Sequence, residues 1–449
     1  MNIGRPRSCP LPPPCPLLGK EGGFPSLFVG AVFVLALLGI PGAVPAQVCG
    51  GDCDGGGSVS VDELVRGVSI ALGTVRLSEC EAFDSSGDGS VTVDELVAAV
   101  SAALEGCRAG AEQAFIIATN FSTGSFATIG VAPPHVLTPV SAERQIHPDA
   151  VARQFGGLVY VINRFMGDSI QLIDPQQGFA TRARCLTGAE LSNPHDIAFV
   201  DSEKAYVSLF DRPEILIVDP TPGDDCQGFV RDRIDLSAFG DGDGLAESDV
   251  MAIAGGKLYV LLQRLDRDNF FVPSGPGGIL EIDIASDTVL RELELTTGNP
   301  FAQTQGLWVE NGSLVVAEAN ELGKNDGGIE RIDPIAGTAL GFFVTEETLG
   351  GDITDFVLVD ERLGYAVVSL ADFSNALVRF DPTTGAKLET VLSGGNYADI
   401  ELNDRGELWV ADSTFGAAGI RIFSAASGVE LTPEPIALGL PPFSIVFVP

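Results

Sequence analysis

The sequence predicts a mostly-β protein in which a large repetitive β domain follows a small helical domain near the N-terminus. Strand-length apolar segments recur throughout residues 114–449 and alternate with turn signals such as Asp-Pro and Thr-Gly. Apolar residues at the three- and four-residue spacing of a helix occur earlier, in LVRGVSIAL (64–72) and LVAAVSAAL (96–104). A chain of 449 residues is also long enough for more than one folded unit.

Residues 1–46 have the layout of a secretory signal peptide. Arg5, Arg7 and Lys20 accompany the apolar run SLFVGAVFVLALLGI (26–40), and AVPA (43–46) supplies small residues before a cut after Ala46. The run is shorter than the roughly 20 residues that a membrane-spanning helix needs. We therefore expect a cleaved leader, with an uncleaved anchor as the alternative. The mature protein is then secreted, periplasmic or at the cell surface, without a membrane span.

The chain is strongly acidic, with 26 Lys and Arg against 61 Asp and Glu and a formal net charge of −35. Loss of the leader removes three basic residues and one acidic residue, so 23 basic and 60 acidic residues remain and the net charge becomes −37. Such a surface repels phosphate backbones and anionic lipids, which argues against a nucleic-acid partner. It suits a protein that binds divalent cations or must stay soluble.

Two segments after the leader repeat each other, DCDGGGSVSVDELV from Asp52 and DSSGDGSVTVDELV from Asp84. Both match the calcium-loop pattern, in which oxygen-bearing residues alternate, a glycine turns the chain and a glutamate closes the shell. The predicted ligands are Asp52, Asp54, Ser58, Ser60 and Glu63 in the first loop, and Asp84, Ser86, Asp88, Ser90, Thr92 and Glu95 in the second. Gly56 removes one side-chain ligand from the first loop, so we expect its Ca²⁺ site to be the weaker.

These loops resemble an EF-hand pair, and the loop-plus-exit-helix order over residues 47–107 is similar to dockerin modules. The EF-hand resemblance implies bound Ca²⁺ and a short β-bridge between Val59 and Val91. The dockerin resemblance implies a cohesin-like partner, although these loops end in Glu63 and Glu95 where dockerin loops typically carry Asp. The alternative is that calcium only holds a small cap domain together.

Cysteine positions predict disulfides in the small domain. Of eight cysteines, Cys9 and Cys15 lie in the leader and four cluster within residues 49–107, where three pairings are possible. The repeat places the other two, Cys185 and Cys226, at opposite ends of adjacent outer strands. That separation exceeds the roughly 7 Å between Cα atoms that a disulfide spans, so we expect no bridge between them.

Residues 108–113 form a short linker, and beyond it a unit of roughly 45 to 55 residues recurs, a period typical of propellers and other arrays. One unit runs DIAFV (196–200), KAYVSLF (204–210) and EILIVD (214–219), and its alternation predicts half-buried strands. Six units are complete. PFSIVFV (442–448) supplies the first strand of a seventh, whose second and third strands are AFIIATN (114–120) and SFATIG (125–130).

We therefore predict a seven-bladed β-propeller over residues 114–449, closed by both ends of the domain, with a small α-helical EF-hand-like domain before it. The repeats resemble the YVTN and NHL type of propeller. This resemblance implies the fold but no particular function.

One face of such a propeller carries the loops before the first strands and the loops between the second and third strands, and we expect any binding site there. Polar residues at or before first strands are His147, Asp149, His195, Asp196, Asp249, Asp355 and Asp399. We expect the Asp residues to hydrogen-bond turn backbone and His195 to be structural rather than a catalytic base.

The longest loop, 263–277, belongs to the same face. Its Phe270 and Phe271 form a partner patch or pin the loop down. Beside it, four acidic residues hold a second cation or form a solvated turn, two alternatives that the sequence leaves equal: Asp241, Asp243, Glu247 and Asp249.

No catalytic motif such as G-x-S-x-G, H-E-x-x-H or a P-loop is found in the sequence. The favoured hypothesis is a secreted calcium-binding protein whose propeller acts as a binding or scaffold module for a protein or glycan partner. The alternative is a calcium-dependent propeller enzyme, a lactonase-like hydrolase or lyase. An enzyme needs inward-facing acids gathered at the channel mouth, whereas a binding module needs only an exposed patch.

Overall fold

The computed structural model describes residues 51–53, 59–84, 90–93, 95–96, 99–100, 103, 112–300, 307–310 and 312–449. The leader and four of the predicted calcium ligands, Asp54, Ser58, Ser86 and Asp88, lie outside these residues. Within the described part, no helix has both the length and the apolar character needed to cross a membrane.

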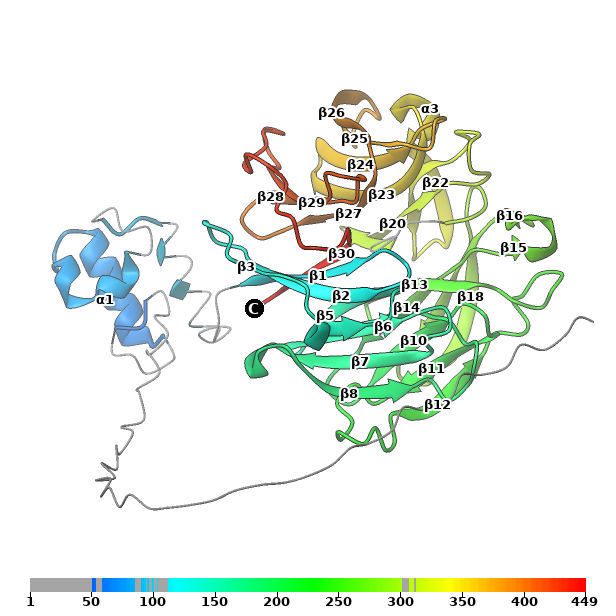
Figure 1. Ribbon diagram of the computed structural model, residues 1–449, viewed down its shortest axis with the longest axis horizontal. Helices are drawn as coiled ribbons and strands as arrows, with labels where there is room; N and C mark the ends of the chain where they lie inside the picture. Colours follow the sequence, from blue (N-terminus) through cyan, green and yellow to red (C-terminus); the bar gives the residue numbers. More distant parts are fainter. Residues whose placement is uncertain are drawn as a thin grey trace, which may run out of the picture. The chain divides into compact units, whose positions relative to one another are not determined.

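The described residues between 113 and 448 form seven antiparallel blade sheets and one separate two-stranded sheet, which confirms the predicted seven-bladed β-propeller (Figure 1). In each blade the first strand is innermost, and the first strands of neighbouring blades contact one another at most of the interfaces around the centre.

We number the blades from the first sheet that is continuous in sequence. Blades 1 to 3 consist of β5 (Ala150–Phe155), β6 (Leu158–Asn163), β7 (Ser169–Asp174) and β8 (Ala180–Leu186); β9 (Pro194–Phe199), β10 (Ala205–Leu209), β11 (Glu214–Val218) and β12 (Val230–Asp235); and β13 (Ser248–Ala254), β14 (Lys257–Leu262), β17 (Gly278–Asp283) and β18 (Thr288–Glu294).

Blades 4 to 6 consist of β19 (Leu307–Glu310), β20 (Ser313–Glu318), β21 (Gly328–Asp333) and β22 (Thr338–Thr345); β23 (Asp352–Asp360), β24 (Leu363–Ser369), β25 (Asn375–Phe380) and β26 (Lys387–Gly395); and β27 (Tyr397–Leu402), β28 (Glu407–Asp412) and β29 (Gly419–Ser424). Blade 6 has three regular strands, and residues 430–436 run along β29 through isolated bridges. A small hairpin, β15 (Leu265–Asp266) and β16 (Val272–Pro273), and a one-turn helix, α3 (Glu346–Leu349), project from the loops.

Blade 7 is built from both ends of the domain, as the sequence predicts. It consists of β30 (Pro442–Val448), β1 (Gln113–Thr119), β2 (Gly124–Gly130) and the short strands β3 (Leu137–Thr138) and β4 (Gln145–Ile146). The red C-terminal strand lies beside the cyan β1 in Figure 1, and the register pairs Gln113 with Val448 and Ile116 with Ile445. The ring is therefore closed by backbone hydrogen bonds between β1 and β30.

The second strands are buried on both faces rather than on one. In β24, Tyr365 and Val367 pack toward blade 6, whereas Ala366 and Val368 pack toward blade 4. Apolar clusters of this kind fill the interfaces all around the ring. Each fully buried Val or Leu side chain contributes about 1.5–3 kcal/mol to stability. The prediction of half-buried strands was wrong here, because each blade lies between two others and KAYVSLF and GYAVVSL are continuous apolar runs.

Second-strand tyrosines also connect neighbouring blades through hydrogen bonds. The Tyr160 hydroxyl donates to the Pro220 carbonyl (2.8 Å), and the Tyr365 hydroxyl donates to the Ala425 carbonyl (2.6 Å). In both cases the acceptor lies in the turn after the third strand of the next blade. Burial raises the pKa of Tyr160 to about 12, so this hydroxyl keeps its proton at physiological pH.

Cys185 and Cys226 form a disulfide with 5.3 Å between their Cα atoms, so the expectation that they remain unpaired was wrong. Cys226 does not lie at the far end of an outer strand. It belongs to the long turn between β11 and β12, and that turn packs across β8 of blade 1. Arg182 of β8 pairs with Asp224 of the same turn (3.2 Å), next to the bridge. The sequence alone does not show this packing, because it depends on where an irregular turn folds.

Residues before the propeller include α1 (Val61–Ala71), which begins three residues earlier than its apolar pattern predicts. The Ser60 side chain accepts from the Glu63 backbone N–H, and the Glu63 carboxylate accepts from the Ser60 N–H, which is a capping box. Phe83 is buried against Ile70, Cys80 and Ala99. A side chain at Gly67 would meet the Phe83 ring at 2.3 Å, so the helix needs glycine there to approach it.

Candidate functional site

The loops before first strands and those between second and third strands form one face of the propeller, which we call the loop face. A pocket of about 680 Å³ opens there, lined by loops of blades 4, 5, 6 and 7. We call it the loop-face pocket. Beside it lies a more open hollow of about 700 Å³ that includes His147, Asp149 and Arg164, and Phe121 and Phe443 line both. The face predicted from the repeat thus carries both of these hollows.

Exposed apolar side chains stand at the tips of the loops between second and third strands. They are Phe121 in blade 7, Phe165 and Met166 in blade 1, Phe270 and Phe271 in blade 3, Leu322 in blade 4, Phe373 in blade 5 and Phe415 in blade 6. Of these, only Phe270 and Phe271 were predicted from the sequence. The others were missed, although NFST, RFMG, DFSN and TFGA carry phenylalanine at the same place in the repeat.

Five of these residues have left-handed backbones, with φ between 58° and 64°: Phe121, Met166, Phe270, Phe271 and Phe373. This region is unfavourable for any residue with a side chain other than Asn or Asp. The same residues also leave a large apolar surface in water. Both costs fall on the loop face, where they indicate that the side chains serve a purpose other than stability.

The loop-face pocket is nearly free of charge. Among the described residues that line it, Asp352 is the only Asp or Glu, and none is basic. Asp352 is 5% exposed and accepts hydrogen bonds from the backbone N–H groups of Gly323 (2.6 Å) and Asn325 (3.3 Å). Its charge is therefore compensated by the loop that it supports.

The predicted acidic group of blade 3 surrounds an arginine. The guanidinium of Arg267 lies 2.9 Å from Glu247, 3.5 Å from Asp243 and 2.6 Å from Asp211. Burial raises the pKa of Glu247, and Arg267 opposes this shift. Arg267 thus supplies the positive charge that a bound cation would supply. The hypothesis of a cation at Asp241, Asp243, Glu247 and Asp249 gains no support from this arrangement.

Asp249 lies apart from that group and pairs with His195. The Nδ1 of His195 is 2.9 Å from the Asp249 carboxylate, and the His195 ring stacks on Phe210 with 4.2 Å between centroids. Asp249 also accepts from the Gln263 amide. His147 instead contacts the backbone of Asp149 within its own turn. The two histidines at first-strand positions therefore have different surroundings, and only His195 has a carboxylate partner.

The aspartates of three first strands bind the next blade. Asp196 accepts from the Met251 N–H (2.8 Å), Asp355 from the Ile400 N–H (2.9 Å) and Asp399 from the Ile445 N–H (2.6 Å). We expected them to bond turn backbone, and the partner is instead the neighbouring first strand. Burial, followed by repulsion from Asp399, raises the pKa of Asp355 well above its usual range. These carboxylates hold the ring together at its centre.

A pair of buried carboxyl groups in blade 4 was missed by the sequence analysis. Glu318 accepts from the Thr297 N–H and hydroxyl, and Glu330 accepts from the Thr296 N–H and hydroxyl. Burial, followed by the neighbouring Glu330, raises the pKa of Glu318 to about 10. Glu318 is therefore neutral at physiological pH. No sequence signal pointed to this pair, because each glutamate occupies an ordinary position in a strand.

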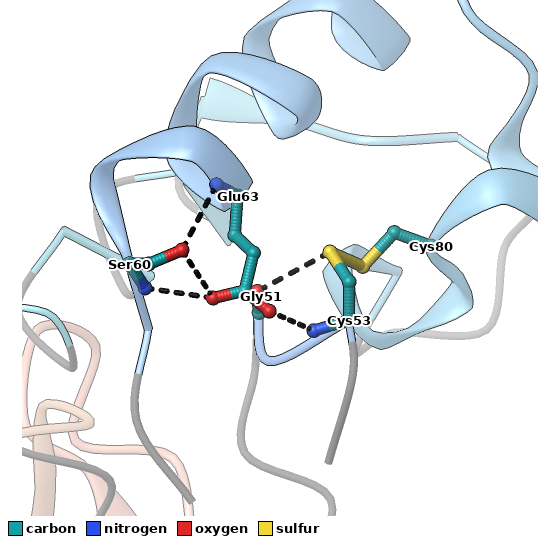
Figure 2. The surroundings of a disulfide bond; sticks show 5 residues. All are labelled: Gly51, Cys53, Ser60, Glu63 and Cys80. Carbon is teal, nitrogen blue, oxygen red and sulfur yellow. Dashed lines mark hydrogen bonds between the residues drawn. A yellow bond between two sulfur atoms is a disulfide. The ribbon is translucent and has the colours of Figure 1, made fainter. Parts of the chain in front are cut away.

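The predicted calcium ligands are described only in part. The Glu63 carboxylate accepts from the Ser60 N–H (2.7 Å), the Ser60 hydroxyl (2.8 Å) and the Cys53 N–H (2.7 Å), beside the Cys53–Cys80 disulfide (Figure 2). Glu95 repeats this with the Thr92 N–H (2.8 Å) and hydroxyl (3.1 Å). Asp52, Asp84 and Ser90 are described as well. Glu63 and Glu95 are the twelfth and last residues of their predicted loops. Both carboxylates thus turn back toward the loop, which is the direction that calcium ligation requires.

Other details of this region differ from the sequence-based expectations. Val59 and Val91 lie outside any strand or bridge, so the expected β-bridge between them is absent. Within the described residues, no three His, Cys, Asp or Glu side chains are grouped in a way that could hold a metal. Asp54 and Asp88, on which the calcium hypothesis depends, lie outside those residues.

Comparison with known proteins supports the fold through one solved structure and shows no family. No family model matches the chain, and no curated protein matches it. A protein from Lactobacillus plantarum is 14% identical with a TM-score of 0.53, over 75% of this chain and 99% of its own. A streptogramin B lyase structure is 12% identical with a TM-score of 0.47, over 66% of this chain and 85% of its own. The structure of apo AztD from Citrobacter koseri is also 12% identical, with a TM-score of 0.44, over 75% of this chain and 98% of its own. At these identities the likeness concerns the fold alone.

Proposed function

We propose that this protein is an extracytoplasmic binding protein whose propeller takes its partner on the loop face, and whose small domain binds Ca²⁺. The observation that carries the proposal is the loop-face pocket, bordered by exposed phenylalanines on left-handed turns. Pockets of roughly 300–1,000 Å³ with apolar walls and a few polar groups are typical of ligand sites. The two disulfides and the signal-peptide pattern support an oxidising compartment.

Calcium binding is proposed from the two sequence loops and from the inward turn of Glu63 and Glu95. In the structure both carboxylates cap the N-terminal end of the helix that follows. A bidentate glutamate in the same place would ligate the ion and still begin that helix. Ca²⁺ would therefore order the loops without changing the course of the chain.

The enzyme hypothesis lacks a comparable observation. It requires free carboxylates gathered at the channel mouth, and Asp196, Asp355 and Asp399 are instead bonded to the backbone of the next blade. A binding role needs no such group.

The test compares two sets of substitutions in the full chain. Phe121→Ala, Phe373→Ala and Phe415→Ala together remove the loop-face phenylalanines of three blades. As a matched control, Leu186→Ala, Leu340→Ala and Leu388→Ala remove exposed apolar side chains from outer strands. Immobilised proteins are incubated with cell-surface and secreted material, and the retained components are compared. We expect the loop-face variant alone to lose the retained partner. Equal retention by both variants and the wild type would refute the proposal.

A further inference from the structure

Phe373 lines the loop-face pocket and is 94% exposed. Its turn is well ordered, because the Phe373 N–H donates to the Leu370 carbonyl (2.8 Å) and the Asp372 carboxylate accepts from the Ser374 N–H (3.0 Å) and hydroxyl (2.7 Å). Glycine would relieve the left-handed backbone and expose less apolar surface at this position. The turn therefore holds an aromatic ring in water at a cost in both backbone and solvation energy.

Phe121 presents a second ring to the same pocket. Its edge contacts the buried Phe443 ring with 5.5 Å between centroids, and its N–H donates to the Thr119 hydroxyl (2.8 Å). That hydroxyl in turn donates to the Pro148 carbonyl (2.6 Å). The ring is thus fixed before any ligand arrives, so its binding surface carries little entropy cost.

Two side-chain amides also line the pocket, those of Asn375 and Asn396. Asn375 begins β25 and Asn396 immediately precedes β27, so both stand on regular strands or next to them. Neither amide hydrogen-bonds any residue that the structure describes. Each offers two N–H donors and one carbonyl acceptor. This combination matches a hydroxyl group, which donates one hydrogen bond and accepts others.

Charge narrows the ligand class further. The chain has a formal net charge of −35, so an anionic ligand is repelled as it approaches. A cationic ligand would find no uncommitted carboxylate among the described lining residues, because Asp352 is already bonded to loop backbone. The pocket is therefore suited to a ligand without charge. Its volume also suits a short chain of rings and is too small to enclose a protein domain.

An uncharged ligand with flat C–H faces and hydroxyl edges is a sugar ring. We propose that the loop-face pocket binds a neutral oligosaccharide, with Phe373 and Phe121 against the faces of its pyranose rings and with Asn375 and Asn396 bonding its hydroxyls. This inference rests on the proposed function and names the ligand class of the same site.

The test titrates the full chain with named oligosaccharides. Cellohexaose, xylohexaose, mannohexaose and fully N-acetylated chitohexaose are the neutral probes, and oligogalacturonate and a heparin oligosaccharide are the charged ones. Isothermal titration calorimetry gives Kd for each. We expect binding of at least one neutral probe and of neither charged probe. Phe373→Ala should raise Kd roughly tenfold or more, as for the central residues of other binding sites. Asn396→Ala should raise it several-fold.

Phe270→Ala is the matched control, because Phe270 is 93% exposed and also left-handed, yet lies outside the pocket. It should leave Kd unchanged. Phe373→Gly is a second variant that removes the ring without risk to the fold, since glycine readily adopts the left-handed backbone of this position. It should lose binding without lowering the melting temperature. Equal effects of Phe270→Ala and Phe373→Ala would overturn the inference, as would binding of charged probes alone or of none at millimolar concentration.

The outcomes separate this inference from the proposed function. If no neutral oligosaccharide binds while the loop-face variant still loses its retained partner, the loop face is a binding surface for another class of ligand. If a neutral oligosaccharide binds and neither Phe373→Ala nor Phe121→Ala weakens it, the sugar site lies elsewhere and this inference fails, whereas the proposed function is still decided by partner retention on the loop-face variant.

Discussion

The Cys185–Cys226 bridge should contribute a large share of the stability of the propeller. It links positions 41 residues apart, and closing a loop of that size in the unfolded chain corresponds to about 4 kcal/mol at 25 °C. Native domains are typically stable by only about 5–15 kcal/mol. We therefore expect Cys185→Ala with Cys226→Ala to lower the free energy of unfolding by about 4 kcal/mol.

The assay is equilibrium urea unfolding followed by tryptophan fluorescence in a Trp308→Phe background, which leaves Trp409 as the only tryptophan. This tryptophan is fully buried in blade 6, so its signal reports unfolding away from the bridge itself. Reversibility is checked by refolding from urea. A parallel transition in circular dichroism would show that the ring unfolds as one unit.

Arg182→Ala provides the control, because the ion pair of Arg182 with Asp224 connects the same two segments without a covalent bond. Both partners are exposed, and such pairs contribute less than about 1 kcal/mol. If the double cysteine variant also loses less than about 1 kcal/mol, the turn between β11 and β12 is held by packing and the loop-closure argument is refuted.

Three further predictions concern individual hydrogen bonds and charges. Glu318→Gln should raise the free energy of unfolding at neutral pH by up to about 3 kcal/mol, since the wild type must take up a proton at this group on folding and the amide need not. The wild type should lose stability as pH rises from about 4.5 toward 10, because unfolding then releases a proton from Glu318. Urea unfolding at pH 6 and pH 9 should show that the free energy of unfolding depends less on pH in the variant. Tyr365→Phe should cost about 1–3 kcal/mol in the same assay by leaving the buried Ala425 carbonyl without its partner, and an unchanged midpoint would contradict that role. Glu95→Gln should abolish the tighter of two Ca²⁺ binding events in calorimetry on the full chain, whereas two unaltered events, or none in the wild type, would disprove the calcium hypothesis.

Most of the fold could be predicted from the sequence because it is repetitive. Each unit carries the same order of strands and turns, so one correctly interpreted unit locates the others. The seventh blade could be predicted as well, since PFSIVFV (442–448) has the pattern of a first strand with no following second strand. One prediction that failed was that Cys185 and Cys226 stay unpaired, because their disulfide depends on an irregular turn of blade 2 that packs across blade 1.

The candidate site was predictable in position but not in composition. The repeat correctly predicted which loops share a face, because strand order determines this. The residues predicted for a site on that face were mostly charged. Two of them, Glu247 and Asp243, are paired with Arg267 in the structure. The phenylalanines at the loop tips were overlooked because single apolar residues in loops are common on protein surfaces. Their left-handed backbone, which makes them unusual, is a property of the structure and not of the residue type.

The pairing of β1 with β30 has a mechanical consequence. The register sets Gln113 opposite Val448 and Ala118 opposite Pro442. The chain therefore enters β1 and leaves β30 at the same end of this pair of strands. Tension applied between these two points of the chain would load the hydrogen bonds one after another, as in opening a zipper, rather than all at once. Blade 7 would then yield at low force. A pull along the opposite diagonal, with handles on the loop face and at residue 113, would meet a much stiffer molecule.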